Sequence, residues 1–245
     1  MWDNAAALNR MSDLLAAAAG LLVLYSVIRF AIAQPVFAMR EIRLGGSTAH
    51  VTLAQVEAIV QSDVHGTFFT LDLARLRGAF EKLPWVRKVD IRRAWPDRID
   101  VVIEEHQPLA RWGDEGLVNR QGEVFKAAYG TSLPVFVGPE GTSREVALQY
   151  DMLRRAFSSI GREPVQVQLS QRRAWRVQLD DGMILEIGRE QMESRLGRFL
   201  SAYPHTLAPL ARRIDYVDLR YANGFAARVP ELTAAHAAPR VRGLR

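Results

Sequence analysis

The residues that could carry chemistry in this sequence are few and widely spaced. The chain has 245 residues, five histidines and no cysteine, so thiol catalysis and cysteine-ligated metal centres are excluded. Glu104 and His106 fall on one face of an expected strand, because side chains alternate along a strand. Two ligands do not close a metal site, and we interpret this segment as a solvated strand end.

Catalytic motifs are also missing from the sequence. It lacks H-E-x-x-H and G-x-S-x-G, and the residues after Gly45-Gly46 do not complete a phosphate-binding loop. A Ser/His/Asp triad assembled from distant residues leaves no local motif, but nothing in the sequence points to one. We therefore expect a protein that is not an enzyme and that has no catalytic residues, metal or cofactor.

Nucleic-acid binding is the next class of function to consider. The net charge is +5, and arginines and tryptophans alternate from Trp85 to Arg98 and from Arg172 to Trp175. Arginines and aromatic residues in such an arrangement can bind single-stranded nucleic acids. Acidic residues lie among these basic residues and reduce the local positive charge: Asp90, Asp97, Asp100, Glu104 and Glu105. We therefore expect no nucleic-acid partner.

The last predicted hairpin has the clearest features of a binding site. Its strands are expected over Ile214–Tyr221 and Phe225–Val229, joined by Ala222-Asn223-Gly224. A strand that comes last can form a sheet edge with unpaired N–H and C=O groups, to which an extended partner can add a strand. Tyr221 and Phe225 would then be aromatic anchors; the alternative is that each packs into the core.

Three regions must position these residues, and the first is apolar. The segment from Leu14 to Ala33 contains one charge, Arg29, and is long enough to cross a membrane. A buried helix and a cleaved signal peptide ending at Ala31-Ile32-Ala33 are the alternatives; we favour a retained span over 14–36. The nearby arginines, Arg10 against Arg29, Arg40 and Arg43, favour a cytoplasmic C-terminal side.

The two folded regions follow the span. Residues 37–107 show the order β-α-α-β-β, with a strand over Met39–Leu44, a helix capped by Thr52 and Gln55, and a second helix over Asp72–Leu83. Residues 108–229 are richer in strands and hold two amphipathic helices, Ser143–Ile160 and Glu190–Tyr203. The fold class is α+β, with a mostly antiparallel second domain. Residues 230–245 have no pattern and are expected to be disordered.

Several blocks of residues resemble the FtsQ/DivIB family of bacterial cell-division proteins, and the proteobacterial FtsQ branch most. The run from Leu83 to Asp97 looks like the end of the family's POTRA domain, and it continues to Pro108, Ala110 and Trp112. Later blocks agree in order: Leu117-Val118-Asn119-x-x-Gly122, Leu133-Pro134, Gly138-Pro139-Glu140-Gly141, Arg172-Arg173-x-Trp175, Arg195-Leu196-x-Arg198-Phe199, Tyr203-Pro204 and Tyr216-Val217-Asp218-Leu219-Arg220-Tyr221-x-x-Gly224.

The resemblance implies a single-pass inner-membrane protein of the division septum. Residues 1–13 would be a short cytoplasmic tail, and the POTRA domain (37–107) and the β domain (108–229) would be periplasmic. Such proteins are non-enzymatic scaffolds that bridge early and late division proteins and bind the FtsB–FtsL pair at the last β-strands. The binding residues carried over by this likeness are Arg172, Arg220, Tyr221, Asn223, Gly224, Phe225, Ala226, Ala227 and Val229.

Two departures and one alternative accompany this resemblance. The N-terminal tail is shorter than in many members, and Val229 stands where relatives often carry a tryptophan. The alternative function is a POTRA-type binding module of a secretion or assembly system, either secreted or anchored in the membrane. A β-barrel of such a system could not fit in the rest of the chain.

Overall fold

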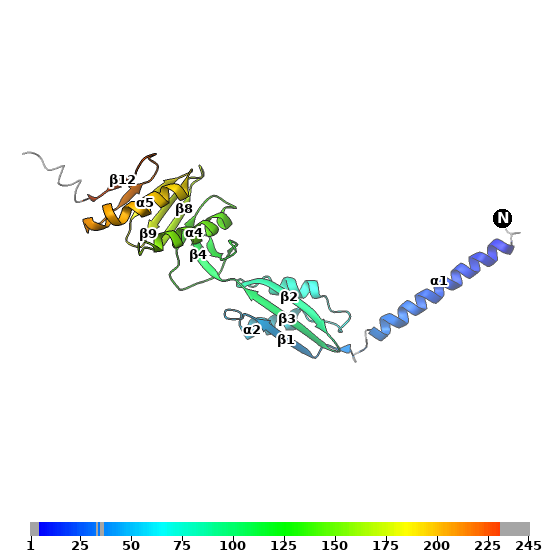
Figure 1. Ribbon diagram of the computed structural model, residues 1–245. Coiled ribbons are helices and arrows are strands. Elements are labelled where there is room, and N and C mark those ends of the chain that lie inside the picture. The colour runs from blue at the N-terminus through cyan, green and yellow to red at the C-terminus, as the bar shows by residue number, and fades with distance from the viewer. Residues whose placement is uncertain (1–4, 33, 35–36, 231–245) are drawn as a thin grey trace, which may run out of the picture. The chain divides into compact units, whose positions relative to one another are not determined.

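The computed structural model describes residues 5–32, 34 and 37–230 (Figure 1). The chain divides into two units between Glu105 and His106, two residues before the boundary predicted from the sequence. The expected disordered tail lies outside the described residues from 231 onward. The start of the expected cytoplasmic tail and residues 33, 35 and 36 of the expected span also lie outside them.

Helix α1 (Ala5–Ile32) carries the apolar segment. Its stretch Asn9–Ile32 is apolar enough to cross a membrane and has no part buried against the rest of the protein. At about 1.5 Å per residue these 24 residues extend over about 36 Å, which exceeds a hydrocarbon core of about 30 Å. The interpretation as a buried helix of a soluble domain is therefore wrong, and the helix fits a single-pass membrane protein.

The first unit has the predicted order β-α-α-β-β. Its central strand is β3, which pairs in parallel with β1 and antiparallel with β2. Apolar side chains of the two helices and of the strands form its core, as expected for an α+β module. The elements are β1 (Glu41–Gly46), α2 (Leu53–Asp63), α3 (Leu73–Phe80), β2 (Val86–Ala94) and β3 (Arg98–Glu105).

Both helices of this unit begin at the residues that the sequence predicts. Thr52 and Gln55 form a capping box before α2, which satisfies N–H groups that a helix start leaves unpaired. The Asp72 carboxylate accepts from the N–H groups of Ala74 and Arg75. Helix α3 ends at Phe80, earlier than the predicted Leu83, because the chain continues as tight turns before Pro84.

Strand β1 corrects the prediction at its C-terminal end. Gly45 and Gly46 do not close the strand but belong to it and pair with Val102 and Ile103. Gly46 has φ +98°, and a Cβ there would collide with the Ile103 carbonyl group. The glycines therefore allow the backbone of β1 to approach that of β3 closely. From the sequence alone, the same two glycines predict the end of the strand.

Glu105 ends β3 and is buried, so this part of the predicted solvated strand end is wrong. Its carboxylate accepts from the backbone N–H groups of Ala49 (3.1 Å), His50 (2.9 Å) and Val51 (2.8 Å). Burial raises the pKa of Glu105, but the hydrogen bonds from His50 and Val51 outweigh it, so the pKa lies below the ordinary 4.5. The carboxylate thereby holds the loop before α2.

The second unit is built on one nine-stranded sheet. The strand order is β12-β11-β10-β9-β8-β7-β4-β5-β6, with five antiparallel and three parallel pairs. The strands are β4 (Pro108–Trp112), β5 (Gly116–Asn119), β6 (Val124–Phe125), β7 (Val135–Val137), β8 (Pro164–Leu169), β9 (Trp175–Leu179), β10 (Ile184–Gly188), β11 (Tyr216–Asp218) and β12 (Ala226–Arg228).

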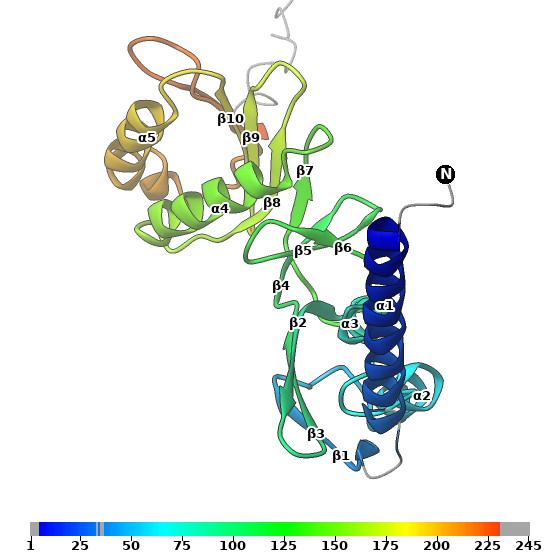
Figure 2. The same cartoon turned by 90° about the vertical axis from the view of Figure 1, so that its right-hand side faces the viewer.

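Two helices cover this sheet on the same side of β7–β10 (Figure 2). Helix α4 (Ser143–Ser158) packs on β7 and β8, and α5 (Met192–Thr206) packs on β10 and on α4. Helix α5 starts two residues later than predicted, because Gln191 has a left-handed backbone with φ 55°. The core between helices and sheet contains the fully buried Phe136, Phe157 and Phe199.

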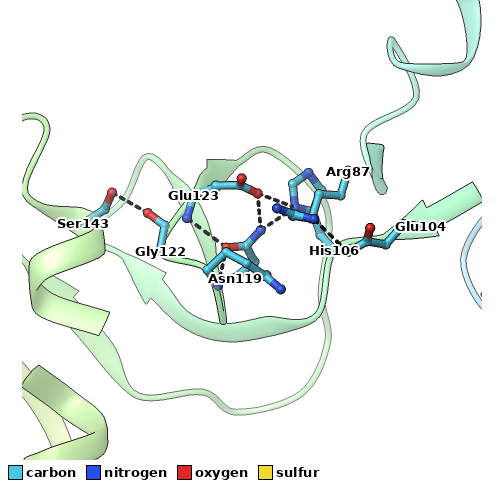
Figure 3. A network of polar contacts seen from close by, with 8 residues as sticks. Arg87, Glu104, His106, Asn119, Gly122, Glu123 and Ser143 are labelled. Carbon is cyan, nitrogen blue, oxygen red and sulfur yellow. Dashed lines mark hydrogen bonds and ion pairs between the residues drawn. The ribbon is translucent and has the colours of Figure 1, made fainter. Parts of the chain in front are cut away.

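Hydrogen bonds around Asn119 fix the turn between β5 and β6, at the β6 end of the sheet (Figure 3). Asn119 is fully buried; its Oδ1 accepts from the N–H groups of Gln121 (3.0 Å) and Glu123 (2.8 Å), and its Nδ2 donates to Glu123 Oε2 (2.7 Å). The same Nδ2 lies 2.9 Å from His106 Nδ1. His106 is thus part of a structural network and stacks on Phe125, with 4.2 Å between ring centroids.

Candidate partner-binding site

Strand β12 forms the opposite edge of the nine-stranded sheet. Among the described residues it pairs with β11 alone, and its three residues are all exposed. Its other backbone edge therefore presents N–H and C=O groups to which another strand could bind. The two alanines leave this edge free of bulky side chains.

The loop from Leu219 to Phe225 leads into this strand and is held by helix α5. The Arg198 guanidinium donates to the carbonyl oxygen of Tyr221 (3.3 Å) and to that of Ala222. The contact uses the backbone carbonyl of Tyr221, and the residue is 58% exposed. Tyr221 therefore lies on a supported loop and not at the end of β11, where the sequence predicts it.

An ion pair holds the start of the same loop. Arg220 donates to both carboxylate oxygens of Asp218, at 2.9 and 2.7 Å, and its backbone N–H donates to Asp218 Oδ1 at 3.0 Å. The hydrogen bonds from Arg220 lower the pKa of Asp218 below 3.8, although burial opposes this shift. The contact also ends β11 at Asp218, because the aspartate binds the backbone two residues on.

Gly188 allows the Arg220 side chain to lie over the end of β10. Gly188 has φ +85°, and a Cβ there would collide with Arg195 Nη1 and approach Arg220 Cγ. Arg195 in turn donates to the carbonyl oxygen of Ile187 at 2.9 Å. Side chains of α5 and of the loop are thus packed together beside this edge.

The remaining predicted site residues fall into two groups. Phe225 is half-buried and packs edge-on against Phe199 of α5, with 5.5 Å between centroids, and Val229 is buried in the core. These two side chains anchor the hairpin. The exposed members are Tyr221, Asn223, Ala226 and Ala227, with Gly224 partly exposed.

Arg172 lies at the same end of the sheet but does not border β12. It is exposed in the turn between β8 and β9. Trp175 of β9 pairs with Gly188 of β10, and Glu186 pairs with Asp218, so the β11–β12 loop is at this end too. Three strand spacings separate β9 from β12, or about 14 Å.

Arg198 and Asp218 are the supporting residues that sequence reasoning missed, although both stand in the quoted family blocks. Arg198 is three residues after Arg195, which places both on one face of α5. A basic pair beside the buried Phe199 is the signal that could have identified Arg198 as a support for a neighbouring loop.

Comparison with known proteins follows the same division of the chain. Residues 37–106 match the family model described as the POTRA domain, FtsQ-type, and residues 110–220 match Cell division protein FtsQ/DivIB, C-terminal. The protein named Cell division protein FtsQ of Nitrosospira multiformis is 45% identical over 233 residues, which cover 93% of this chain and 99% of that relative. The chain belongs to the FtsQ/DivIB family.

Two further relatives support the assignment at nearly full length. The Cell division protein FtsQ of Burkholderia pseudomallei is 41% identical, covering 93% of this chain and 94% of its own. That of Neisseria gonorrhoeae is 34% identical, covering 93% and 95%. The chain is therefore a cell-division protein with an FtsQ-type POTRA domain and one membrane-spanning helix, which confirms the family and the fold class expected from the sequence.

Proposed function

We propose that this protein is a non-enzymatic scaffold of the divisome that binds the FtsB–FtsL pair at the exposed edge of β12. The edge carries the proposal: in the part of the chain that the structure describes, β12 has one strand neighbour, exposes all three of its residues and follows a loop held by Arg198. A partner segment in extended conformation would add a tenth strand through main-chain hydrogen bonds. Tyr221, beside the start of that strand, would bury its ring on the partner.

The proposed topology places the N-terminus in the cytoplasm and both folded units in the periplasm, at the division septum. The POTRA domain would contact other division proteins, so that the chain bridges early and late components. The local arginine count favours the opposite orientation, but large domains cross the membrane despite a local charge bias. The proposal therefore needs a direct test of orientation.

The absence of cysteine makes that test simple. Single cysteines at Asn4 and at the exposed Asn223 are compared for labelling by a maleimide that crosses the outer but not the inner membrane. The proposal predicts labelling at 223 and none at 4 in intact inner membranes. Labelling at 4 alone would invert the topology and remove the proposed role.

Photocrosslinking in cells tests the binding edge. A photoreactive residue at 221 or 227 is expected to capture a small single-pass coiled-coil protein. The matched control is position 124, since Val124 is exposed on β6 at the other edge of the same sheet. Capture of that protein with equal yield from 124, or no capture from either β12 position, would contradict the proposal.

A further inference from the structure

Four aromatic rings gather at one end of the POTRA domain. Phe37 meets Phe69 at 5.2 Å between centroids, Phe69 meets Phe68 at 5.2 Å, and Phe68 meets Trp95 at 5.8 Å. They come from three segments: the chain before β1, the loop between α2 and α3, and the turn between β2 and β3. We call these four residues the aromatic cluster.

Two members of the aromatic cluster face the solvent. Trp95 is 68% exposed and Phe69 is 46% exposed, whereas Phe68 is buried beneath them. Folding ordinarily removes such rings from water, because burying an aromatic side chain lowers the free energy by about 1.5–3 kcal/mol. Two large exposed rings that both pack against Phe68 on a small domain indicate a surface that another apolar phase covers.

The backbone beneath the aromatic cluster is held in place. Arg93 donates from Nε to the Phe68 carbonyl at 2.7 Å and from Nη2 to the Leu71 carbonyl at 2.6 Å. The Phe68 N–H donates to the Phe37 carbonyl at 2.8 Å. The backbone that carries the rings is therefore held by hydrogen bonds.

The aromatic cluster is also tied to the membrane-spanning helix. Phe37 follows Ile32, the last residue of α1, by five residues, which can extend over at most about 17 Å. Thr67, next to Phe68, donates from Oγ1 to the Ile32 carbonyl at 3.0 Å. The headgroup layers add about 10–15 Å in total to the hydrocarbon core, so the cluster is within reach of the layer at this end of α1.

We propose that the aromatic cluster inserts into the lipid headgroup layer where α1 leaves the membrane. Tryptophan and other amphipathic rings are enriched at that level of the bilayer. Insertion would set the orientation of the POTRA domain against the membrane plane, because it would add a second contact with the bilayer to that made by α1. The lipid contact adds to the scaffold function and does not depend on β12.

The charges around the cluster indicate that the contact is apolar and not electrostatic. Three neighbouring arginines are each paired with an acid, Arg40 with Asp97, Arg92 with Asp90 and Arg98 with Asp100. A fourth, Arg93, donates to the Phe68 and Leu71 carbonyls. A paired surface does not need anionic lipids, and its binding changes little with salt. The proposed partner of the aromatic cluster is therefore a lipid bilayer, and a bilayer of phosphatidylcholine alone is sufficient.

Spin labels on the full-length chain in phosphatidylcholine vesicles test this proposal. Labels are attached to single cysteines introduced as Trp95→Cys, Phe69→Cys and Leu53→Cys, and exchange with a water-soluble nickel complex and with oxygen is measured. Leu53 is the matched control, since it is 67% exposed and is the first residue of α2, next to the loop that Glu105 holds at the end of β3. Positions 69 and 95 should be severalfold less accessible to nickel and more accessible to oxygen than position 53.

Two results would overturn the proposal. One is equal nickel accessibility at all three positions in vesicles. The other is protection of 69 and 95 in cell membranes but not in pure lipid, which would assign the cluster to a protein partner. Thermal unfolding midpoints equal to that of the unlabelled chain, expected because both rings are exposed, verify that the labelled domain is folded. A failed crosslink at β12 would not alter either outcome.

Discussion

The two edges of the nine-stranded sheet are both short, but they are finished in opposite ways. Strand β6 has two residues, and the turn before it is closed by the buried Asn119 and by Ser143, whose Oγ donates to the Gly122 carbonyl at 2.7 Å. Strand β12 has three residues, all exposed, and its supporting contacts come from behind, through Arg198 and Phe225. Among the described residues each edge strand has one strand neighbour; the β6 edge is fixed by its own turn, whereas the β12 edge is held from behind by α5.

This difference shows what distinguishes a protected edge from a receptive one. The β6 edge, here the protected one, is kept in place by hydrogen bonds inside its own turn. A receptive edge must remain ordered without those bonds, because an ordered strand loses less entropy on binding. The contacts of α5 with the loop supply that order.

The largest expected effect falls on the protected edge. Asn119→Ala removes hydrogen bonds from a fully buried side chain and leaves N–H groups of Gln121 and Glu123 without their acceptor. We expect the free energy of unfolding of the second unit to fall by about 2–4 kcal/mol. Chemical denaturation followed by tryptophan fluorescence measures the change.

The control for this variant is Asn223→Ala, since Asn223 is exposed in the β11–β12 loop. It should change the unfolding free energy by less than about 0.5 kcal/mol. Under conditions where Asn119→Ala is still folded, its affinity for the division partner should equal that of the unchanged chain. A loss of affinity there would mean that the two edges are not independent.

The next effect falls on the receptive edge. Along an edge strand, successive residues direct their N–H groups alternately toward the neighbouring strand and outward. Of Ala226→Pro and Ala227→Pro, one variant should therefore lose stability, and the other should keep its unfolding midpoint while partner affinity falls at least tenfold, about 1.4 kcal/mol. Unfolding curves and binding isotherms of the two variants are compared. Retained affinity in the stable variant would contradict strand addition.

A smaller effect is expected from the support behind the edge. Arg198→Ala removes the donor to the Tyr221 and Ala222 carbonyls, and the loop should lose order. We expect partner affinity to fall about fivefold, since a hydrogen bond contributes about 1 kcal/mol. Arg155→Ala, on the exposed end of α4, is the matched control. Equal affinities of the two variants would show that the loop needs no support.

The smallest effect concerns acid pH. The pKa of Asp218 is lower in the folded protein, chiefly through its hydrogen bonds with Arg220, so the contribution of this pair is present above pH 3.8 and is lost as the pH falls through the folded value. Asp218→Asn should remove that part of the pH dependence of unfolding. Thermal melts between pH 5 and pH 2 test the slope; identical slopes in both proteins would assign the acid sensitivity to other carboxylates, Glu105 among them.

The order of the elements could be predicted because it depends on local patterns. Alternation identified β2 and β3, and capping residues identified the start of α2. The neighbours in the sheet could not be predicted: β7 inserts in parallel between β4 and β8, a choice made by long-range packing. The edge position of β12 agrees with its last place in the sequence.

The candidate site was predictable in position but not in detail. Tyr221 and Phe225 are both aromatic, yet one is exposed and the other packs on Phe199. That difference depends on where the Asp218–Arg220 contact ends β11 and on where α5 lies, and neither is a property of the hairpin sequence. Asn119 stood in a family block, but its four polar contacts join residues whose proximity follows from the turn.

The small side chains of β12 have a consequence for alignment. Ala226 and Ala227 offer only methyl groups to a strand laid beside them, so a partner displaced by two residues would meet almost the same surface. The register of the partner strand must then be set by contacts at the two ends of β12, with the Tyr221 ring before the strand and with the Arg228 charge at its last residue. A partner segment of the wrong length would therefore still pair with the edge, but it would lose its contact with either Tyr221 or Arg228.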